Sequence, residues 1–161
     1  MKPENPAKSF LRRYRAAAAR VESLQRVIDT AYDRAYSCTS RLKPIVVDGS
    51  RAYDRMAEDV AKITDTEELL RQAQTDAFAI LDEVLEAIRA VPDELQKAVL
   101  TMRYVEGASW PSIQDRLGYE RTQAYVIHGW ALQRVNRWLQ EKVRTKTDYL
   151  TCYNETVKER P

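Results

Sequence analysis

Apolar residues recur every seven positions along the first 43 residues of the chain. Two series interleave there: Tyr14, Val21, Ile28, Ala35 and Leu42 form one, and Phe10, Ala17, Leu24, Ala31 and Cys38 form the other. Repeated heptads of this kind are typical of a coiled-coil seam, so the spacing predicts a helix of about 30 residues.

A second apolar stripe follows a break in this pattern. Pro44 disfavours helix at the residue before it, and Asp48, Gly49 and Ser50 have turn chemistry. The stripe then consists of Met56, Val60, Ile63, Leu70, Ala73, Ala77, Ile80, Leu81, Val84 and Ile88. Because a short turn makes two helices antiparallel, we predict a coiled-coil-like helical hairpin over residues 1–90. Two helices bury little surface alone, so we expect a third helix or a second chain, in a homodimer, to cover it.

Shorter apolar steps follow Val91. Leu95, Ala98, Val99 and Met102 mark a helix ending near Val105, where Gly107 is a good stop. Ser109 is a suitable N-cap for a two-turn helix that Gly118 ends. The inward positions of this helix and of the long helix after it are Trp110, Ile113 and Leu117, then Ala124, Ile127, Ala131, Val135 and Leu139.

This order of elements is the plan of a helix-turn-helix domain, which we place at residues 91–145, with a C-terminal tail at 146–161. Gly118 supplies a left-handed backbone that a residue with a Cβ adopts only at a cost. The polar start of the third helix would then project beyond the domain, where it can enter a DNA major groove.

Positions on the outward side of the third helix, and basic or polar side chains near it, are the candidate DNA contacts. Arginine can pair with guanine and glutamine with adenine, whereas threonine or valine can meet a thymine methyl group. The candidates are Arg121, Thr122, Gln123, Tyr125, Val126, Gly129, Gln133, Arg116, Ser112 and Arg137. For Gly129, packing against another helix and close approach to a DNA backbone are both open.

Composition and charge agree with an all-α chain. Only four glycines and six prolines occur among 161 residues, so long helices and few loops are expected. The net charge of +2 divides into +6 for residues 1–43, −7 for 44–93 and +3 for 94–161. The basic and acidic segments are expected to attract across the hairpin. Four cations near the start are either a solvated helix face or a phosphate-contacting arm: Lys8, Arg12, Arg13 and Arg15.

Residues 91–139 resemble region four of bacterial sigma factors. The matching points are Pro92, Leu100, Arg103, Tyr104, Gly107, Ser109, Ile113, Leu117, Gly118, Arg121, Ala131 and Leu132. The long helical N-terminal half also makes the chain similar in plan to phage and prophage regulators, including late-gene activators of the RinA and ArpU type. Glu120 and Tyr125 depart from the sigma pattern, and no sigma region two is recognisable in residues 1–90.

The resemblance implies that Arg121, Thr122, Tyr125 and Val126 occupy base-reading positions and that the domain surface touches RNA polymerase. The expected function is therefore sequence-specific binding of double-stranded DNA to regulate phage or prophage genes. Two alternatives are a phage small terminase subunit, which predicts rings of eight or more chains, and a helical protein–protein adaptor.

No pattern of catalytic or metal-ligating residues stands out. His128 is the single histidine and has no Ser or Cys partner at a recognisable spacing, and neither a zinc pattern nor a Gly-rich phosphate loop occurs. We expect no enzyme activity, no metal and no cofactor. The absence of a long apolar run or signal peptide leads us to expect a protein of the bacterial cytoplasm that does not enter a membrane. Cys38 and Cys152 are then expected to be reduced thiols.

Overall fold

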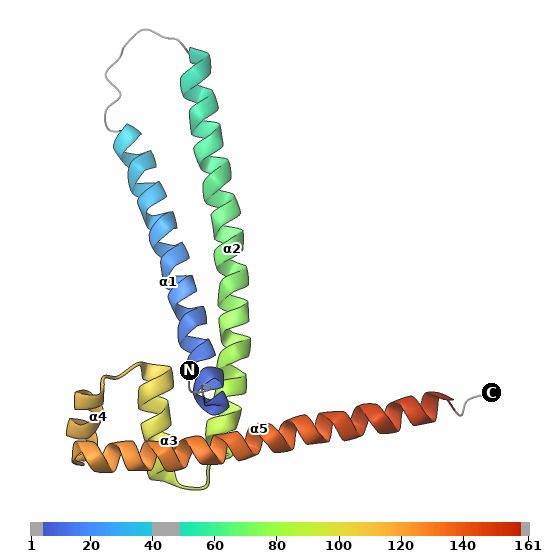
Figure 1. Cartoon of the computed structure of the whole chain (residues 1–161). Helices are drawn as coiled ribbons and strands as arrows, with labels where there is room; N and C mark the ends of the chain where they lie inside the picture. The colour runs from blue at the N-terminus through green and yellow to red at the C-terminus, as the bar shows by residue number, and fades with distance from the viewer. Residues whose placement is uncertain (1–4, 40–48, 159–161) are drawn as a thin grey trace. The chain divides into compact units, whose positions relative to one another are not determined.

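The computed structural model describes the backbone of residues 5–39 and 49–158, and the side chains of 5–34 and 60–145. It confirms the all-α fold class, because the described residues form helices and no strand. The elements are α1 (Pro6–Thr39), α2 (Gly49–Arg89), α3 (Glu94–Leu100), the π-helical turn η1 (Thr101–Glu106), α4 (Trp110–Leu117) and α5 (Arg121–Lys158) (Figure 1). None of the described helices is long and apolar enough to cross a membrane.

The chain divides into two compact units. Residues 16–80 form one, which we call the hairpin unit, and residues 1–15 together with 81–161 form the other, the C-terminal unit. The sequence-based boundary lay at residue 90. The start of α1 and the end of α2 therefore belong with the helices that follow them, in a unit made of two separate stretches of chain.

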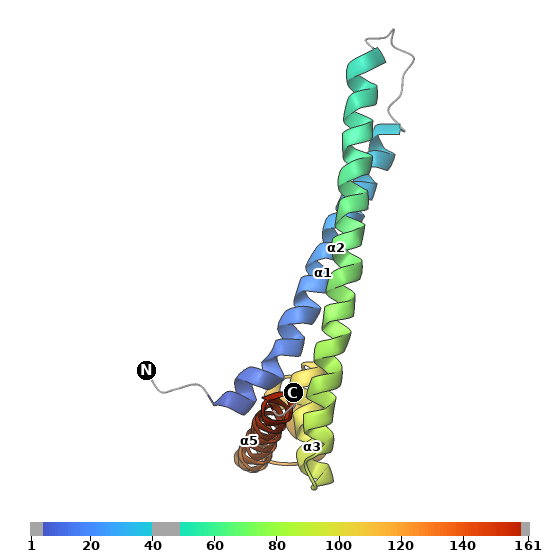
Figure 2. The same ribbon diagram turned by 90° about the vertical axis from the view of Figure 1, so that its right-hand side faces the viewer.

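In the hairpin unit, α1 and α2 run antiparallel (Figures 1 and 2). The Tyr32 hydroxyl donates a 2.7 Å hydrogen bond to Oε1 of Glu67 across the pair. On α1 the described heptad positions are buried or half-buried, as predicted for a seam: Ala17, Val21, Leu24, Ile28 and Ala31. The turn expected at Pro44 lies outside the described residues, and α2 begins at Gly49.

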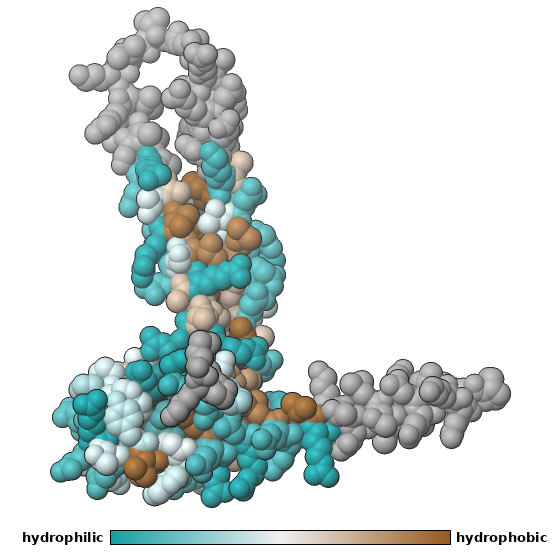
Figure 3. Space-filling view, in the orientation of Figure 1, coloured by the Kyte–Doolittle hydropathy of each residue, from teal (hydrophilic) through white to brown (hydrophobic). Residues whose placement is uncertain are grey.

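Several apolar side chains of the hairpin unit are exposed to solvent. Val27, Val60 and Leu69 are each 53% exposed, and Phe78 is 68% exposed. Val60 was predicted to be a stripe residue, so this position of the prediction is wrong. Figure 3 shows apolar surface on this unit. These four side chains leave apolar area that a partner could cover.

The C-terminal unit is built on the first half of α5, against which α3 and α4 pack. The apolar stripe predicted for α5 is confirmed, since Ala124, Ala131 and Val135 are fully buried and Ile127 is nearly so. The largest fully buried side chains of the unit come from all five helices and from the segment between α2 and α3: Leu11, Val84, Val91, Val99, Leu100, Ile113 and Val135.

The start of α1 is fixed to α5 by a pair of asparagines. The backbone N–H of Ala7 donates to Oδ1 of Asn136 at 2.8 Å and to Oδ1 of Asn5 at 3.0 Å. Nδ2 of Asn136 donates to Oδ1 of Asn5 at 2.9 Å. Asn5 thus satisfies an N–H that a helix start leaves free, and Asn136 holds the same turn from α5.

Helix α3 and η1 form one rod with defined ends. The Asp93 side chain accepts a 2.9 Å hydrogen bond from the backbone N–H of Gln96 at the start. Gly107 ends the rod with φ 77°, which confirms its predicted role as a helix stop. The Arg15 guanidinium lies against Gly107, where a Cβ would collide with it. A cation is favourable there, since the C-terminal end of a helix carries partial negative charge.

Helix α5 does not end at residue 145, where the sequence-based description placed a tail. It continues to Lys158. No glycine or proline occurs between Trp130 and Arg160, so nothing in the sequence stops the helix. The side chains of Cys38 and Cys152 lie outside the described side chains.

Candidate nucleic-acid interface

The turn between α4 and α5 has the geometry of a helix-turn-helix. Helix α4 is capped by Ser109, whose Oγ accepts from the backbone N–H of Ser112 at 3.4 Å. Gly118 ends it with φ 67°, and its N–H donates to the carbonyl oxygen of Gln114. A Cβ on Gly118 would meet nothing within 4 Å. The positive φ alone therefore explains the glycine.

The first turn of α5 is closed by one of the candidate side chains. Oε1 of Gln123 accepts from the backbone N–H of Glu120 at 3.4 Å. The backbone N–H of Ala124 donates to the carbonyl oxygen of Glu120, which begins the ladder of helix hydrogen bonds. Gln123 thus caps the helix in the way that a glutamine at the third position does, and its Nε2 amide is the part left to reach a base.

The candidate residues at the start of α5 share its solvent side. Arg121 and Thr122 are exposed, and Tyr125 and Val126 are 39% and 43% exposed. Gly129 follows one turn later, where a Cβ would meet nothing within 4 Å. None of the described residues therefore approaches Gly129 closely enough to require a glycine there.

Aromatic rings support this end of α5. The ring centroids of Trp110 and Tyr125 are 4.4 Å apart. The Arg121 guanidinium carbon lies 5.6 Å from the Tyr125 ring, and that of Arg103 lies 5.2 Å from the Trp110 ring. Stacking on a ring limits the conformations of an arginine side chain. Arg121 is thereby positioned at the tip of the helix by its neighbour one turn on.

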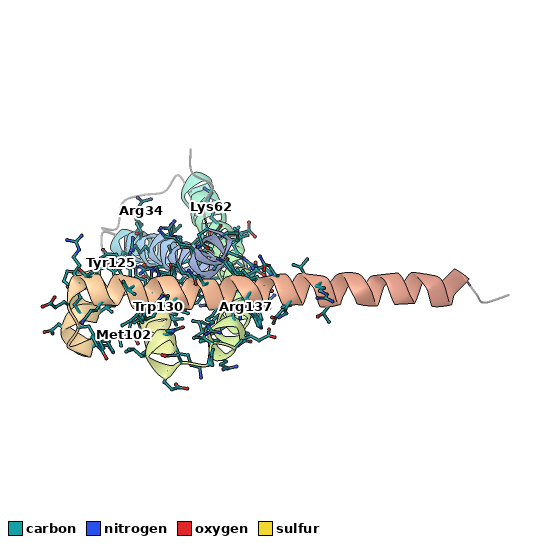
Figure 4. The ribbon with its side chains drawn as sticks, turned by 60° about the horizontal axis from the view of Figure 1, so that its bottom comes forward. Arg34, Lys62, Met102, Tyr125, Trp130 and Arg137 are labelled. Atoms are coloured by element: carbon teal, nitrogen blue, oxygen red, sulfur yellow. The ribbon has the colours of Figure 1, made fainter. Side chains whose placement is uncertain are left out.

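The remaining candidates lie elsewhere on the C-terminal unit. Ser112 and Arg116 are exposed on α4, and Arg116 forms a 2.5 Å ion pair with Glu106. Gln133 and Arg137 are further along α5, where they line a hollow with the exposed Trp130. Figure 4 shows Trp130 and Arg137 along α5. The structure thus places Arg121, Thr122, Gln123, Tyr125, Val126 and Gly129 on the first turns of α5. Ser112 and Arg116 belong to α4, and Gln133 and Arg137 belong to later turns of α5.

Behind Tyr125 lies a buried histidine. The Tyr104 hydroxyl and Nε2 of His128 are 3.0 Å apart, within hydrogen-bond distance. The Trp110 and His128 rings are nearly perpendicular, with their centroids 5.0 Å apart. Burial, with smaller contributions from the nearby cations Lys8 and Arg103, lowers the pKa of His128 to about 4. His128 is therefore neutral at physiological pH and has a packing role.

Sequence reasoning did not find the hollow beside this histidine. It has a volume of about 360 Å³, and we call it the basic hollow because three of its lining side chains are cations. Its lining residues are Asn5, Lys8, Arg12, Arg103, Tyr104, Trp110, Tyr125, His128 and Leu132. The signal in the sequence was Asn5 before Pro6, a helix-start pattern that fixes where α1 begins.

Metal binding has no support among the described side chains, since no group of three or more His, Cys, Asp or Glu is placed to hold an ion. The outward side of α5 instead offers an arginine, hydroxyl groups and a short apolar side chain. These groups suit recognition by hydrogen bonds and contacts in a groove.

The chain is similar to a curated protein, the RNA polymerase sigma factor SigO of Bacillus subtilis (strain 168). The two are 28% identical over 119 residues, which cover 74% of this chain and 67% of the sigma factor. The aligned stretch is longer than residues 91–145, so the similarity extends beyond the helix-turn-helix. No family model and no solved structure matches the chain.

Proposed function

We propose that this chain is a transcription regulator that binds specific sequences of double-stranded DNA through the start of α5. The observation that carries the proposal is the division of α5 into two sides. Ala124, Ala131 and Val135 are fully buried, whereas Arg121, Thr122 and Val126 face solvent directly after the Gly118 turn. This is how helix-turn-helix domains present a recognition helix to a major groove.

The similarity to a sigma factor supports a role in transcription. We propose further that the regulated genes belong to a phage or prophage and that the C-terminal unit contacts RNA polymerase. The chain would act by binding, with no chemistry of its own. Retention of the purified chain on immobilised RNA polymerase at low salt tests this contact, and loss of retention there would count against it.

We propose that the hairpin unit makes the protein a homodimer. Phe78 is 68% exposed and Val27, Val60 and Leu69 are each 53% exposed, which leaves apolar area for a second copy to cover. Light scattering on the purified chain should give the mass of two chains. A ring of eight or more chains would favour a small terminase subunit instead.

Replacing Arg121 and Thr122 together with alanine should weaken binding to the preferred DNA by about ten- to a hundredfold. The reason is that one good bidentate contact to a base contributes about 1–3 kcal/mol of discrimination. The preferred duplex is obtained by selection from a random pool with the unchanged chain, and affinities are then measured by fluorescence anisotropy.

The matched control replaces Arg20 and Thr30, two exposed residues of the hairpin unit, with alanine. It removes the same charge and the same hydroxyl group, so its affinity should stay near that of the unchanged chain. Equal weakening in both variants would show that Arg121 and Thr122 act only through net charge. An unchanged chain that enriches no duplex would refute the proposed function.

A further inference from the structure

All the charged side chains that line the basic hollow are positive. Lys8, Arg12 and Arg103 contribute to its lining, and no acidic side chain does so among the described residues. The pKa values of its buried groups respond to these cations. Lys8 and Arg103 add to the lowering that burial causes in His128, while Arg12 and Arg103 oppose the rise that burial causes in Tyr104. All three cations therefore act on the same small volume.

The hollow lies directly beside the proposed recognition side of α5. Tyr125 belongs to both, since it lines the hollow and stacks with Arg121. Trp110, another lining residue, is the first residue of the eight-residue helix α4. The start of a helix carries partial positive charge, which adds to the attraction for an anion.

The aromatic rings of the hollow are already engaged. Trp110 and Tyr125 pack on each other with centroids 4.4 Å apart, and an arginine lies over each of them, Arg103 over Trp110 and Arg121 over Tyr125. A nucleic-acid base would need a free ring on which to stack. A phosphate needs only the cations, so phosphate fits the hollow better than a base does.

We propose that the basic hollow binds a backbone phosphate of the DNA duplex that α5 reads, with Lys8 and Arg12 as the contacting side chains. This inference rests on the proposed function. Arg103 lines the same hollow, and its Nη1 donates a 2.9 Å hydrogen bond to the carbonyl oxygen of Ala108. The first turns of α1 would then be part of the DNA-binding surface, held in place by Asn5 and Asn136.

The test measures how salt weakens DNA binding. Each phosphate contact that a protein makes with B-DNA contributes about 0.9 to the slope of log affinity against log salt concentration. For the Lys8→Gln, Arg12→Gln double variant, the slope should fall by about 1.8 relative to the unchanged chain. The probes are the duplex enriched by the unchanged chain and a scrambled duplex of the same length. The ratio of the two affinities should be unchanged, because phosphates carry no sequence information.

A matched control, Arg20→Gln with Arg34→Gln, removes two exposed cations from the part of α1 in the hairpin unit and should keep the original slope. Thermal unfolding of the double variant checks that the fold is intact. If its slope equals that of the unchanged chain, the phosphate site is refuted while the recognition role of Arg121 stands. An unchanged chain that binds no duplex would overturn both proposals together.

A second arm separates a DNA phosphate from a free anion. The unchanged chain is heated in sodium phosphate and in sodium chloride of equal ionic strength. The double variant is heated in the same two salts. If phosphate raises the melting temperature of the unchanged chain but not of the double variant, and the two proteins have the same salt slope for DNA, the hollow binds a free anion. That result would overturn the assignment to DNA.

Discussion

Replacing Leu11 with alanine should lower the free energy of unfolding of the C-terminal unit by about 2–5 kcal/mol, the usual range for a buried leucine. Leu11 is fully buried although it lies in α1, far along the chain from the other helices of the unit. Stability falls for two reasons: folding removes fewer apolar atoms from water, and the missing side chain leaves a cavity. Urea titration of the full chain gives the value.

Tryptophan fluorescence is the appropriate signal for this titration. The chain has three tryptophans, Trp110, Trp130 and Trp138, and all of them lie in the C-terminal unit. The matched control is Val143→Ala in the same unit, where the valine is 66% exposed and the change should stay within about 0.5 kcal/mol. Equal small effects of both variants would mean that the start of α1 does not pack into the C-terminal unit.

Acidification from pH 7 to pH 5 should remove about 2 kcal/mol of stability that depends on His128. The pKa of this side chain is lowered from 6.5 to about 4 in the folded protein, chiefly by burial. The unfolded chain therefore takes up the proton first as the pH falls. The contribution is fully present above the unfolded pKa, decreases as the pH falls from 6.5 towards 4, and below that reaches a total loss of about 3 kcal/mol.

The comparison that isolates this effect uses His128→Gln. Unfolding free energies of the unchanged chain and the variant are measured by urea titration at both pH values. Carboxylates titrate equally in the two proteins, so the difference between them should change by about 2 kcal/mol. A variant with the same dependence on pH as the unchanged chain would show that His128 is accessible to protons in the folded state.

Local signals in the sequence were sufficient for the helix-turn-helix. Gly107, Ser109 and Gly118 have the roles that their chemistry predicts, because a cap or a positive φ depends on only a few neighbouring residues. The inward positions of α5 were also predicted correctly, since one helix side packs against a single core.

Positions whose side chains interact with more than one part of the structure were harder to predict. The heptad in α1 marks Phe10 and Tyr14, yet Ala7 and Leu11 are the fully buried residues of its first turns. This part of α1 packs into the C-terminal unit. The heptad repeat describes only the seam between α1 and α2, so it does not predict that contact. Gln123 was predicted to contact DNA, and the sequence did not indicate that its Oε1 also caps the helix start. A local hydrogen bond of this kind competes with outside partners and leaves no trace in apolar spacing.

The asparagine pair at the base of α1 has a consequence for synthesis. Asn5 and Asn136 are separated by 131 residues, so the contact forms only after Asn136 has left the ribosome. Until then the nascent N-terminal helix lacks this contact, and closing so long a loop has an entropic cost. A ribosome that stops before residue 100 would release a chain with three of the nine residues that line the basic hollow and without α5.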